Sequence, residues 1–343
     1  MKNKYMFVAL MLSVILLVSF GFTNIYVSHI QAEQDEDFVV VTSFYPMYIA
    51  AMNVIGDTEG VTLKNLSEPQ TGCLHDFQLT PADMKLLSTA DVFIINGGGV
   101  ESFMEEIAAQ YPELVIIEAC GDINLLCDDL DHNHENEEQE SEEGNLVPDD
   151  DEAHESEDIH DENDLHAGHD HGDVNAHAWM SVELYRQQIV NITNGLVQAD
   201  EVHSASYLAN QKSYDGKLSE LQQLQKEIRQ FLPEHGEVVL FHSAYAYLAR
   251  EYGMEVAFCM DLDEERQVSA GEVAEVIEVI EHHGVKYIFA EELYAKDMCN
   301  LIQKEVEVEI IYLDPLTRGE YDVDGYLHAM RENINRIKNI VSN

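Results

Sequence analysis

The middle of this 343-residue chain concentrates two kinds of side chain that bind metal ions. Between Lys85 and Arg186 there is no basic residue, and from Asp128 onward the sequence is a run of Asp, Glu and His. Seven of the 16 histidines lie in this tract, ahead of His177: His132, His134, His154, His160, His166, His169 and His171. Imidazole is the commonest side-chain ligand for zinc-like ions, and carboxylates attract cations. The tract therefore indicates a protein that handles a transition metal.

Two further candidate ligands lie on either side of the tract. His75 is in the loop ahead of a helix that Thr80 and Pro81 are expected to begin, as N-cap and first residue. On its own, His75 could be an ordinary solvated loop residue. His177 stands where the tract ends, and Ser181 could cap the helix that follows it. Taken alone, His177 could equally be the last member of the tract.

Two more candidates follow predicted strands in the second half of the chain. His242 comes directly after the run 237–241, and Asp314 comes after 309–313. In an open parallel sheet, the loops at the carboxyl ends of the strands line the ligand crevice. Each residue could instead be a helix cap or turn residue, since Asp is common in turns. Glu291, also at a strand end, is interpreted as a salt-bridging group and is the reserve ligand if Asp314 fails.

Together these four candidates offer three imidazoles and one carboxylate, at His75, His177, His242 and Asp314. That set suits Zn²⁺ in tetrahedral geometry. Four protein ligands close the coordination sphere, which fits binding better than catalysis, because a catalytic zinc keeps one position open for water.

The elements that must position these residues follow an α/β pattern. Short β-branched runs alternate with helical stretches, as in parallel sheets with helices on both faces. Four runs lie in each half, so we expect two similar sheets rather than one large one. The predicted strands are 38–43, 60–66, 91–96, 114–119, 237–242, 254–260, 285–290 and 309–314.

Between the two halves, the segment 203–232 has apolar residues at three- and four-residue spacing and ends before Pro233. A helix of this length would be about 40 Å long. It could join the two halves as a strut, or it could be an ordinary long surface helix.

Other composition signals bound the class of protein. The formal net charge of −48 excludes a nucleic-acid binder, which needs a basic surface. Residues 1–34 place two lysines ahead of a long apolar stretch, typical of an export signal that is either cleaved or kept as an anchor. Gly97–Gly99 follow a predicted strand and are interpreted as a tight turn rather than a phosphate-binding loop, because Glu101 would repel phosphate.

In an exported chain, cysteines can be expected to form disulfides. Five are present, and Cys120 with Cys127, or Cys259 with Cys299, could pair. No Cys-x-x-Cys pattern exists, so a thiolate zinc site is not expected.

Four segments occur in this order: "HDFQLTPADMKLLSTADVFIINGGGVESF", "NAHAWMS", "FHSAYAYLAREYG" and "IFAEELY…IIYLDPL". With them, residues 38 to 343 resemble the zinc/manganese solute-binding proteins of bacterial ABC importers, of the cluster A-I type. The resemblance implies two lobes, each with a four-stranded parallel sheet flanked by helices, joined by one long rigid helix. The lobes would be 36–200 and 236–343, with 203–232 as the joining helix.

The resemblance also implies a site and partners. Its metal ligands match His75, His177, His242 and Asp314, and the histidine at position 242 goes with a preference for Zn²⁺ over Mn²⁺. The partner would be an ABC permease, the location periplasmic or cell-surface, and the receptor a monomer without enzymatic activity. This sequence departs from the family pattern by lacking the proline usual before the second histidine and the one usual after the Trp segment, where Val182 stands. It also lacks the lipidated cysteine common in Gram-positive members, so tethering would need the N-terminal segment.

The tract itself, 128–172, has too few large apolar residues to fold alone, so we expect it to be disordered without metal. It would act as a weak, multi-site collector of metal. Three alternatives remain open at this level. They are a manganese or iron receptor of the same fold, a secreted zinc hydrolase using the same histidines, and a metal-buffering or adhesive surface protein in which only the tract matters.

Overall fold

The computed structural model describes residues 37–71, 77–127, 174–232, 236–260, 262, 266 and 268–341, together with Met11 and Ser19. The predictions for the N-terminal segment 1–34 (apart from those two residues), for His75 and for the tract 128–172 lie outside the described residues.

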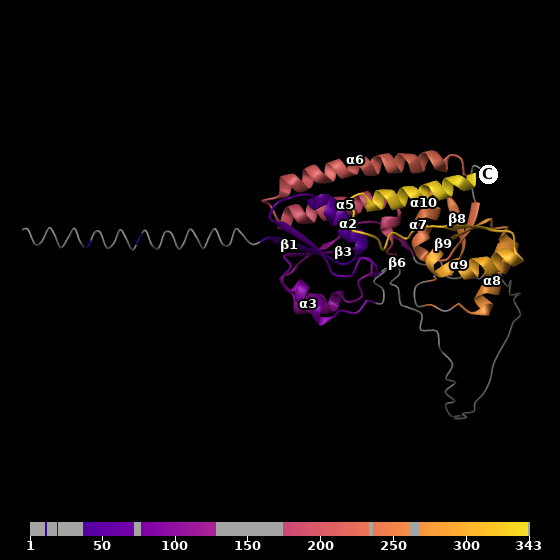
Figure 1. The fold of residues 1–343 in the computed structure, drawn as a ribbon, viewed down its shortest axis with the longest axis horizontal. Helices are drawn as coiled ribbons and strands as arrows, with labels where there is room; N and C mark the ends of the chain where they lie inside the picture. The colour runs from indigo at the N-terminus through magenta and orange to yellow at the C-terminus, as the bar shows by residue number, and fades with distance from the viewer. Residues whose placement is uncertain are drawn as a thin grey trace, which may run out of the picture.

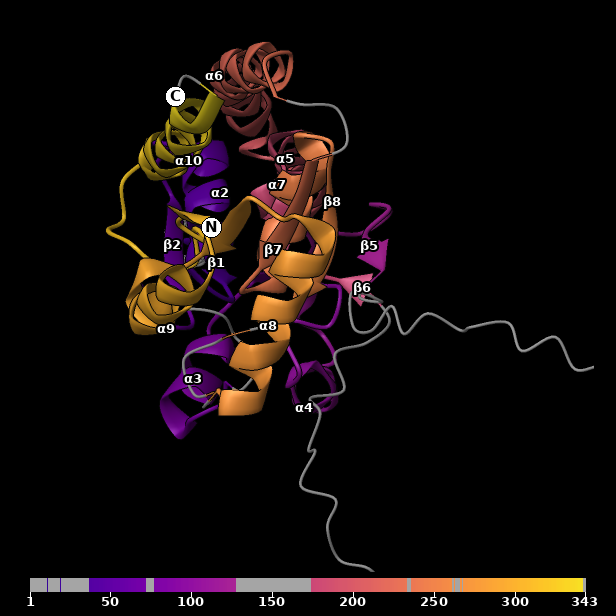
Figure 2. The same ribbon diagram turned by 90° about the vertical axis from the view of Figure 1, so that its right-hand side faces the viewer.

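The first sheet forms the N-terminal lobe and contains four parallel strands in the order β2-β1-β3-β4. The strands are β1 (Phe38–Thr42), β2 (Val61–Asn65), β3 (Val92–Ile95) and β4 (Val115–Glu118). The helices α2 (Tyr45–Ile55) and α5 (Val182–Ala199) pack on one another and against this sheet. The helices α3 (Pro81–Leu87) and α4 (Met104–Gln110) lie on the opposite side of the lobe (Figures 1 and 2).

The second sheet forms the C-terminal lobe and repeats this topology in the order β10-β9-β7-β8. Its parallel strands are β7 (Gly236–Leu240), β8 (Met254–Cys259), β9 (Tyr287–Ala290) and β10 (Glu309–Tyr312). Its helices are α7 (Ala246–Glu251), α8 (Ala270–His283) and α9 (Glu292–Glu305). In both sheets the first strand lies between the second and the third, so the prediction of two similar four-stranded sheets is confirmed.

The long helix between the sheets is α6, Ser204–Arg229, which matches the predicted helix to within a few residues. Its 26 residues give a length of about 39 Å at 1.5 Å per residue. It packs on α2, α5 and the last helix, α10 (Gly325–Val341), and runs along one side of both lobes (Figure 1). Its start is fixed by the buried Asp200, whose carboxylate binds the Nδ1 of His203 and the hydroxyl of Tyr207, each at 2.6 Å.

The hydrophobic core does not stop at the boundary between the lobes. One large cluster runs from the N-terminal sheet through Trp179 to one face of β7, where it includes Val238 and Leu240. The opposite face of β7, with Val239 and Phe241, belongs to a second, smaller cluster beneath α8 and α9. The lobes are therefore joined by shared packing as well as by α6, because one hydrophobic cluster contains residues of both.

The predicted helix starts are also confirmed. Thr80 caps α3 through a reciprocal pair of hydrogen bonds with Asp83, and Pro81 is its first residue. Ser181 accepts the amide of Leu184 at the start of α5.

Two features differ from expectation. The sequence pattern does not predict the short strands β5 (Leu126–Cys127) and β6 (Val174–Asn175), which pair antiparallel. The disulfide expectation is wrong for both proposed pairs, because the four described cysteines are thiols. Cys120 is buried beside Gln188, whose Nε2 lies 3.2 Å from its sulfur, while Cys127 is exposed in β5. Cys259 ends β8 and Cys299 lies in α9, a helix that packs against β10 at the far edge of the sheet.

Across the ranges given above, no helix combines the length and the apolar character needed to cross a membrane.

Candidate metal centre

His177 lies two residues after the end of β6 and directly before the 3-10 turn η1 (Ala178–Met180), which leads into α5. The β5–β6 pairing holds this point of the chain, because Leu126 is opposite Asn175 in the ladder. The His177 ring is only 3% exposed and lies edge-on to Trp179, with ring centroids 5.1 Å apart. The tract therefore ends on a fixed stem, and His177 belongs to the folded lobe rather than to the tract.

His242 occupies the matching place in the C-terminal lobe. It follows β7 and precedes another 3-10 turn, η2 (Ser243–Tyr245), which leads into α7. Its ring is 8% exposed. The Nδ1 atom accepts a hydrogen bond of 3.0 Å from the amide of Ala244, so His242 also serves as the N-cap of its own turn.

The two rings face each other across the boundary between the lobes. Their centroids are 5.0 Å apart and the ring planes are nearly perpendicular, at 86°. Two imidazoles bound to one tetrahedral Zn²⁺ would have centroids roughly 5 Å apart, given Zn–N distances of about 2.0 Å. The distance of 5.0 Å between the ring centroids of His177 and His242 matches this spacing.

The two rings differ in where their protons must lie. The side-chain amide of Asn175 donates through Nδ2 to the carbonyl of Ser243 at 2.8 Å, which leaves its Oδ1 facing the Nδ1 of His177 at 3.0 Å. Since Oδ1 can only accept, the proton of neutral His177 is on Nδ1, and Nε2 keeps a lone pair. In His242 the Nδ1 lone pair is already used by Ala244, which places the proton of the neutral ring on Nε2. His242 can bind a metal through Nε2 only after releasing that amide.

Asp314 stands at the carboxyl end of β10, as predicted. The turns that follow His177 and His242 each hydrogen-bond to a residue next to Asp314. The hydroxyl of Tyr245 donates to the carbonyl of Leu313, and the indole of Trp179 donates to that of Pro315, each at 2.9 Å. One of these hydrogen bonds therefore comes from the N-terminal lobe and the other from the C-terminal lobe. The side chain of Asn333 also bonds to both the amide and the carbonyl of Asp314, at 2.8 Å each.

The Asp314 carboxylate is half-buried and accepts the amide of Leu316 at 2.8 Å. Burial raises the pKa of this carboxyl above its ordinary value, although the Leu316 amide and the charges of Arg336 and Arg318 act in the opposite direction. A cation placed beside the carboxylate would relieve this burial penalty.

The structure brings together only part of the predicted set. His177 and His242 are adjacent, and Asp314 is tied to both of their turns. His75 lies outside the described residues, and no group of three or more potential metal ligands forms among the residues that are described. Glu291 is at the N-cap of α9, directly after β9, as the sequence predicts, while Glu292 pairs with Lys296 at 2.7 Å.

The interpretation of Gly97–Gly99 as a tight turn is confirmed. All three glycines have positive φ angles, of 82°, 65° and 91°. The buried carboxylate of Glu101 accepts the amides of Asn96 and Gly97, at 2.8 and 3.0 Å, and the hydroxyl of Ser43 at 2.8 Å. The donors that a phosphate would need are therefore occupied by this protein's own carboxylate.

The residue that the sequence reasoning missed is Asn175. It is 2% exposed and contacts His177 on one side and the turn of His242 on the other. Its only local signal is its place two residues ahead of His177, where a side-chain oxygen can accept the amide of the second residue onward. Its partners in the other lobe leave no trace in the sequence.

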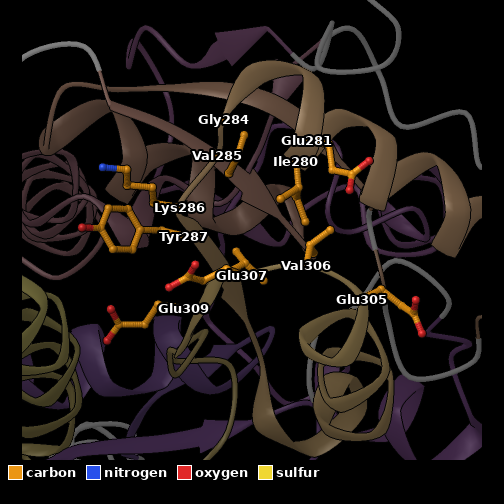
Figure 3. A pocket seen from close by; sticks show the side chains of 11 residues that line it. Ile280, Glu281, Gly284, Val285, Lys286, Tyr287, Glu305, Val306, Glu307 and Glu309 are labelled. Atoms are coloured by element: carbon orange, nitrogen blue, oxygen red, sulfur yellow. The ribbon is translucent and has the colours of Figure 1, made fainter.

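A hollow lies elsewhere in the C-terminal lobe (Figure 3). It has a volume of about 760 Å³ and lies at the amino ends of β9 and β10, away from His242 and Asp314 at the carboxyl ends. Its polar lining is mostly acidic, with Glu281, Glu305, Glu307 and Glu309. It contains no histidine and is separate from the candidate centre.

Comparisons of sequence and of structure with known proteins agree with one another over most of the chain. The family model for the periplasmic zinc-uptake complex component A, ZnuA, matches residues 40–340. The high-affinity zinc uptake system protein ZnuA of Bacillus subtilis (strain 168) is 28% identical over 305 residues, covering 87% of this chain and 86% of that protein. The manganese-binding lipoprotein MntA of Halalkalibacterium halodurans is 21% identical over 308 residues, covering 88% of each. Among solved structures, the SBP FpvC of Pseudomonas aeruginosa in complex with Ni²⁺ has a TM-score of 0.67 and 22% identity, and the match covers 89% of this chain and 97% of that one.

Proposed function

Because the chain belongs to the family of the periplasmic zinc-uptake complex component A, we propose that it is an extracytoplasmic receptor that captures Zn²⁺ between its lobes and delivers it to an ABC-type permease. As a solute-binding protein it is not an enzyme, which answers the alternative of a zinc hydrolase. The proposed ligands are His75, His177, His242 and Asp314.

The observation that carries this proposal is the pairing of His177 and His242. The rings come from different lobes, both are buried, and their centroids are 5.0 Å apart. Asp314 supplies a carboxylate whose neighbouring carbonyls are bound by Trp179 and Tyr245, one from each histidine's turn. Three of the four proposed ligands thus come from segments that are fixed to one another, and His75 would complete the set.

Zinc is proposed as the cargo because imidazole-rich sites with a single carboxylate suit Zn²⁺, whereas Mn²⁺ favours oxygen ligands. Relatives that bind manganese share the fold, so manganese or iron remains the second candidate. Calorimetric competition between Zn²⁺ and Mn²⁺ separates these candidates. A chain that held Mn²⁺ in preference to Zn²⁺ would overturn the choice of cargo without touching the receptor assignment.

The direct test of the ligand set is metal analysis of the purified protein with single substitutions. His75→Ala and His242→Ala should each remove the tightly held ion. His328→Ala is the matched control, because this histidine is exposed on α10. Tight binding that survives both His75→Ala and His242→Ala would refute the proposed site.

The tract is proposed as a weak collector that raises the local metal concentration, separate from the tight site. The β5–β6 ladder supports this division, because it is formed by described residues outside the tract and His177 follows it on folded structure. Deleting residues 128–172 should lower the total zinc bound per chain while the tight site keeps its affinity. Loss of the tight site on this deletion would contradict the division.

Delivery is proposed to occur when docking on the permease disturbs the ligands of one lobe. We also propose that the chain is exported, with residues 1–34 as signal peptide or anchor and the lobes spanning 36–200 and 236–343; the periplasmic family supports this location. The receptor is proposed to act as a monomer, which size-exclusion chromatography with light scattering tests directly.

A further inference from the structure

Asn175 makes four hydrogen bonds or close polar contacts in the seam between the lobes, besides its place in the β5–β6 ladder. Its Nδ2 donates to the carbonyl of Ser243 at 2.8 Å. Its Oδ1 lies 3.1 Å from the amide and 3.0 Å from the Nδ1 of His177. Its carbonyl accepts the hydroxyl of Tyr247 at 2.5 Å, and its backbone pairs with Leu126 in the β5–β6 ladder.

The orientation of this amide is fixed from the C-terminal lobe. Ser243 presents a carbonyl, which can only accept, so the NH₂ group of Asn175 must face it. The oxygen of the amide therefore faces the His177 ring, and the ring must present Nδ1–H to it. As a result the lone pair of the neutral His177 ring is on Nε2.

Asn175 also links the two candidate ligands, His177 and His242, through its hydrogen bonds. Ser243 directly follows His242, so the Asn175 side chain holds the second ligand's turn as well as the first ligand's ring. Tyr247, from α7, adds a second tie, because its hydroxyl donates to the Asn175 carbonyl and accepts the amide of Leu126 at 3.1 Å.

We propose that Asn175 is a positioning residue for metal capture: it holds His177 in the Nδ1–H tautomer and, through Ser243, holds the His242 turn at coordinating distance. This inference rests on the proposed function, in which His177 and His242 share one ion. Asn175 is not itself a ligand, and its effect on the His177 tautomer can be measured in the metal-free protein.

The experiment compares N175A, N175D and the unchanged chain, all full length. Two-bond ¹H–¹⁵N correlations of the imidazoles report which nitrogen carries the proton, and the His177 signal is assigned by its absence from His177→Ala. We expect a single Nδ1–H tautomer for His177 in the unchanged metal-free protein and a mixture in N175A. Zinc affinity, measured with a competing chromophoric chelator, should fall roughly 10- to 100-fold in N175A, the range typical for groups that orient metal-binding histidines.

The near-isosteric N175D separates the two roles and covers the case in which N175A does not fold. Its carboxylate can still accept from Nδ1 of His177 but cannot donate to Ser243. It should therefore keep the Nδ1–H tautomer and bind zinc more tightly than N175A, yet more weakly than the unchanged chain. N191A is the matched control, because Asn191 also donates to two carbonyls, those of Ala119 and Gly121, but lies away from the centre.

The outcomes distinguish this inference from the proposed function. An unchanged His177 tautomer in N175A, or zinc affinity in N175D as low as in N175A, would overturn the positioning role. If instead the unchanged chain failed to bind Zn²⁺, Mn²⁺ or Fe²⁺ tightly, the proposed function would fail, while the tautomer measurement on metal-free protein would still decide what Asn175 does.

Discussion

The turns that carry His177 and His242 are built alike but hold their rings differently. Each histidine follows a strand, precedes a 3-10 turn and leads into a helix. The His177 ring donates from Nδ1 to Asn175, whereas the His242 ring accepts at Nδ1 from its own turn. The proton of neutral His177 is therefore on Nδ1, whereas metal binding through Nε2 of His242 would require the loss of its hydrogen bond from the Ala244 amide.

The packing around the two turns also differs, and the His177 turn is the one that lies within a single core cluster. Trp179 and Met180, which follow His177, lie in the large core cluster that spans the lobes. His242 sits at a boundary, since Phe241 before it belongs to the small cluster and Ala244 after it belongs to the large one. The His177 turn is thus packed within one cluster, whereas the His242 turn lies where the two clusters meet.

The largest effect should come from removing the ligands themselves, and the comparison predicts an asymmetry between them. His177→Ala and His242→Ala should each weaken zinc binding by roughly 100-fold or more, given the strength of zinc coordination. His177→Ala should be the more damaging by about fivefold, because the gain from coordinating His242 is reduced by a lost hydrogen bond worth about 1 kcal/mol. Chelator competition at fixed pH measures both.

The metal-free stability of the same variants sharpens the comparison. His242→Ala also removes the cap of its turn, which should destabilise the metal-free fold by about 1 kcal/mol. Equal zinc losses in the two variants would show that the Ala244 hydrogen bond does not oppose binding, and the asymmetry between the turns would then have no consequence for capture.

A smaller effect on affinity is expected for Asp314→Asn, which keeps an oxygen for the Leu316 amide but removes the charge. Zinc affinity should fall roughly tenfold, since a carboxylate is a stronger zinc ligand than an amide. The metal-free protein should become more stable at neutral pH, because burial raises the pKa of the Asp314 carboxyl and the fold disfavours its ionised form.

The pH dependence of that gain has a definite sign. A raised pKa means that the unchanged protein is relatively most stable when Asp314 is protonated, and it loses that contribution as the pH rises through the folded-state pKa. The advantage of Asp314→Asn should thus be largest at neutral pH and vanish below the ordinary range of an aspartate. Thermal unfolding of metal-free protein across this range checks the sign, and an advantage that grew on acidification would contradict it.

The fold was largely readable because its signals are local. Buried β-branched runs and helix caps such as Thr80 and Ser181 act through neighbours in the chain, and the predicted strands and helix starts were confirmed. The positions of His242 and Asp314 followed from their places at strand ends. The tautomers did not, because they depend on Asn175, whose partners Ser243 and Tyr247 are 68 and 72 residues away.

The disulfide prediction failed for the same physical reason. Sequence spacing suggested pairing of Cys259 with Cys299, but the order of the strands determines which side chains meet. With β10-β9-β7-β8, the strand that ends at Cys259 is at one edge, and the helix that carries Cys299 packs against the strand at the other.

The smallest effect should come from Tyr245→Phe, which leaves the packing in place and removes one tie between the His242 turn and the Asp314 strand. The Tyr245 hydroxyl donates to the carbonyl of Leu313, so its loss should lower the free energy of unfolding by about 1 kcal/mol and weaken zinc binding only a few-fold. Tyr252→Phe is the matched control, because among the described residues the buried Tyr252 hydroxyl has no partner in normal hydrogen-bond geometry. If the Asp314 strand is held mainly from the His177 side, through Trp179, zinc affinity in Tyr245→Phe should match that of Tyr252→Phe. A clear difference in zinc affinity between Tyr245→Phe and Tyr252→Phe would show that the His242 turn also positions the Asp314 carboxylate.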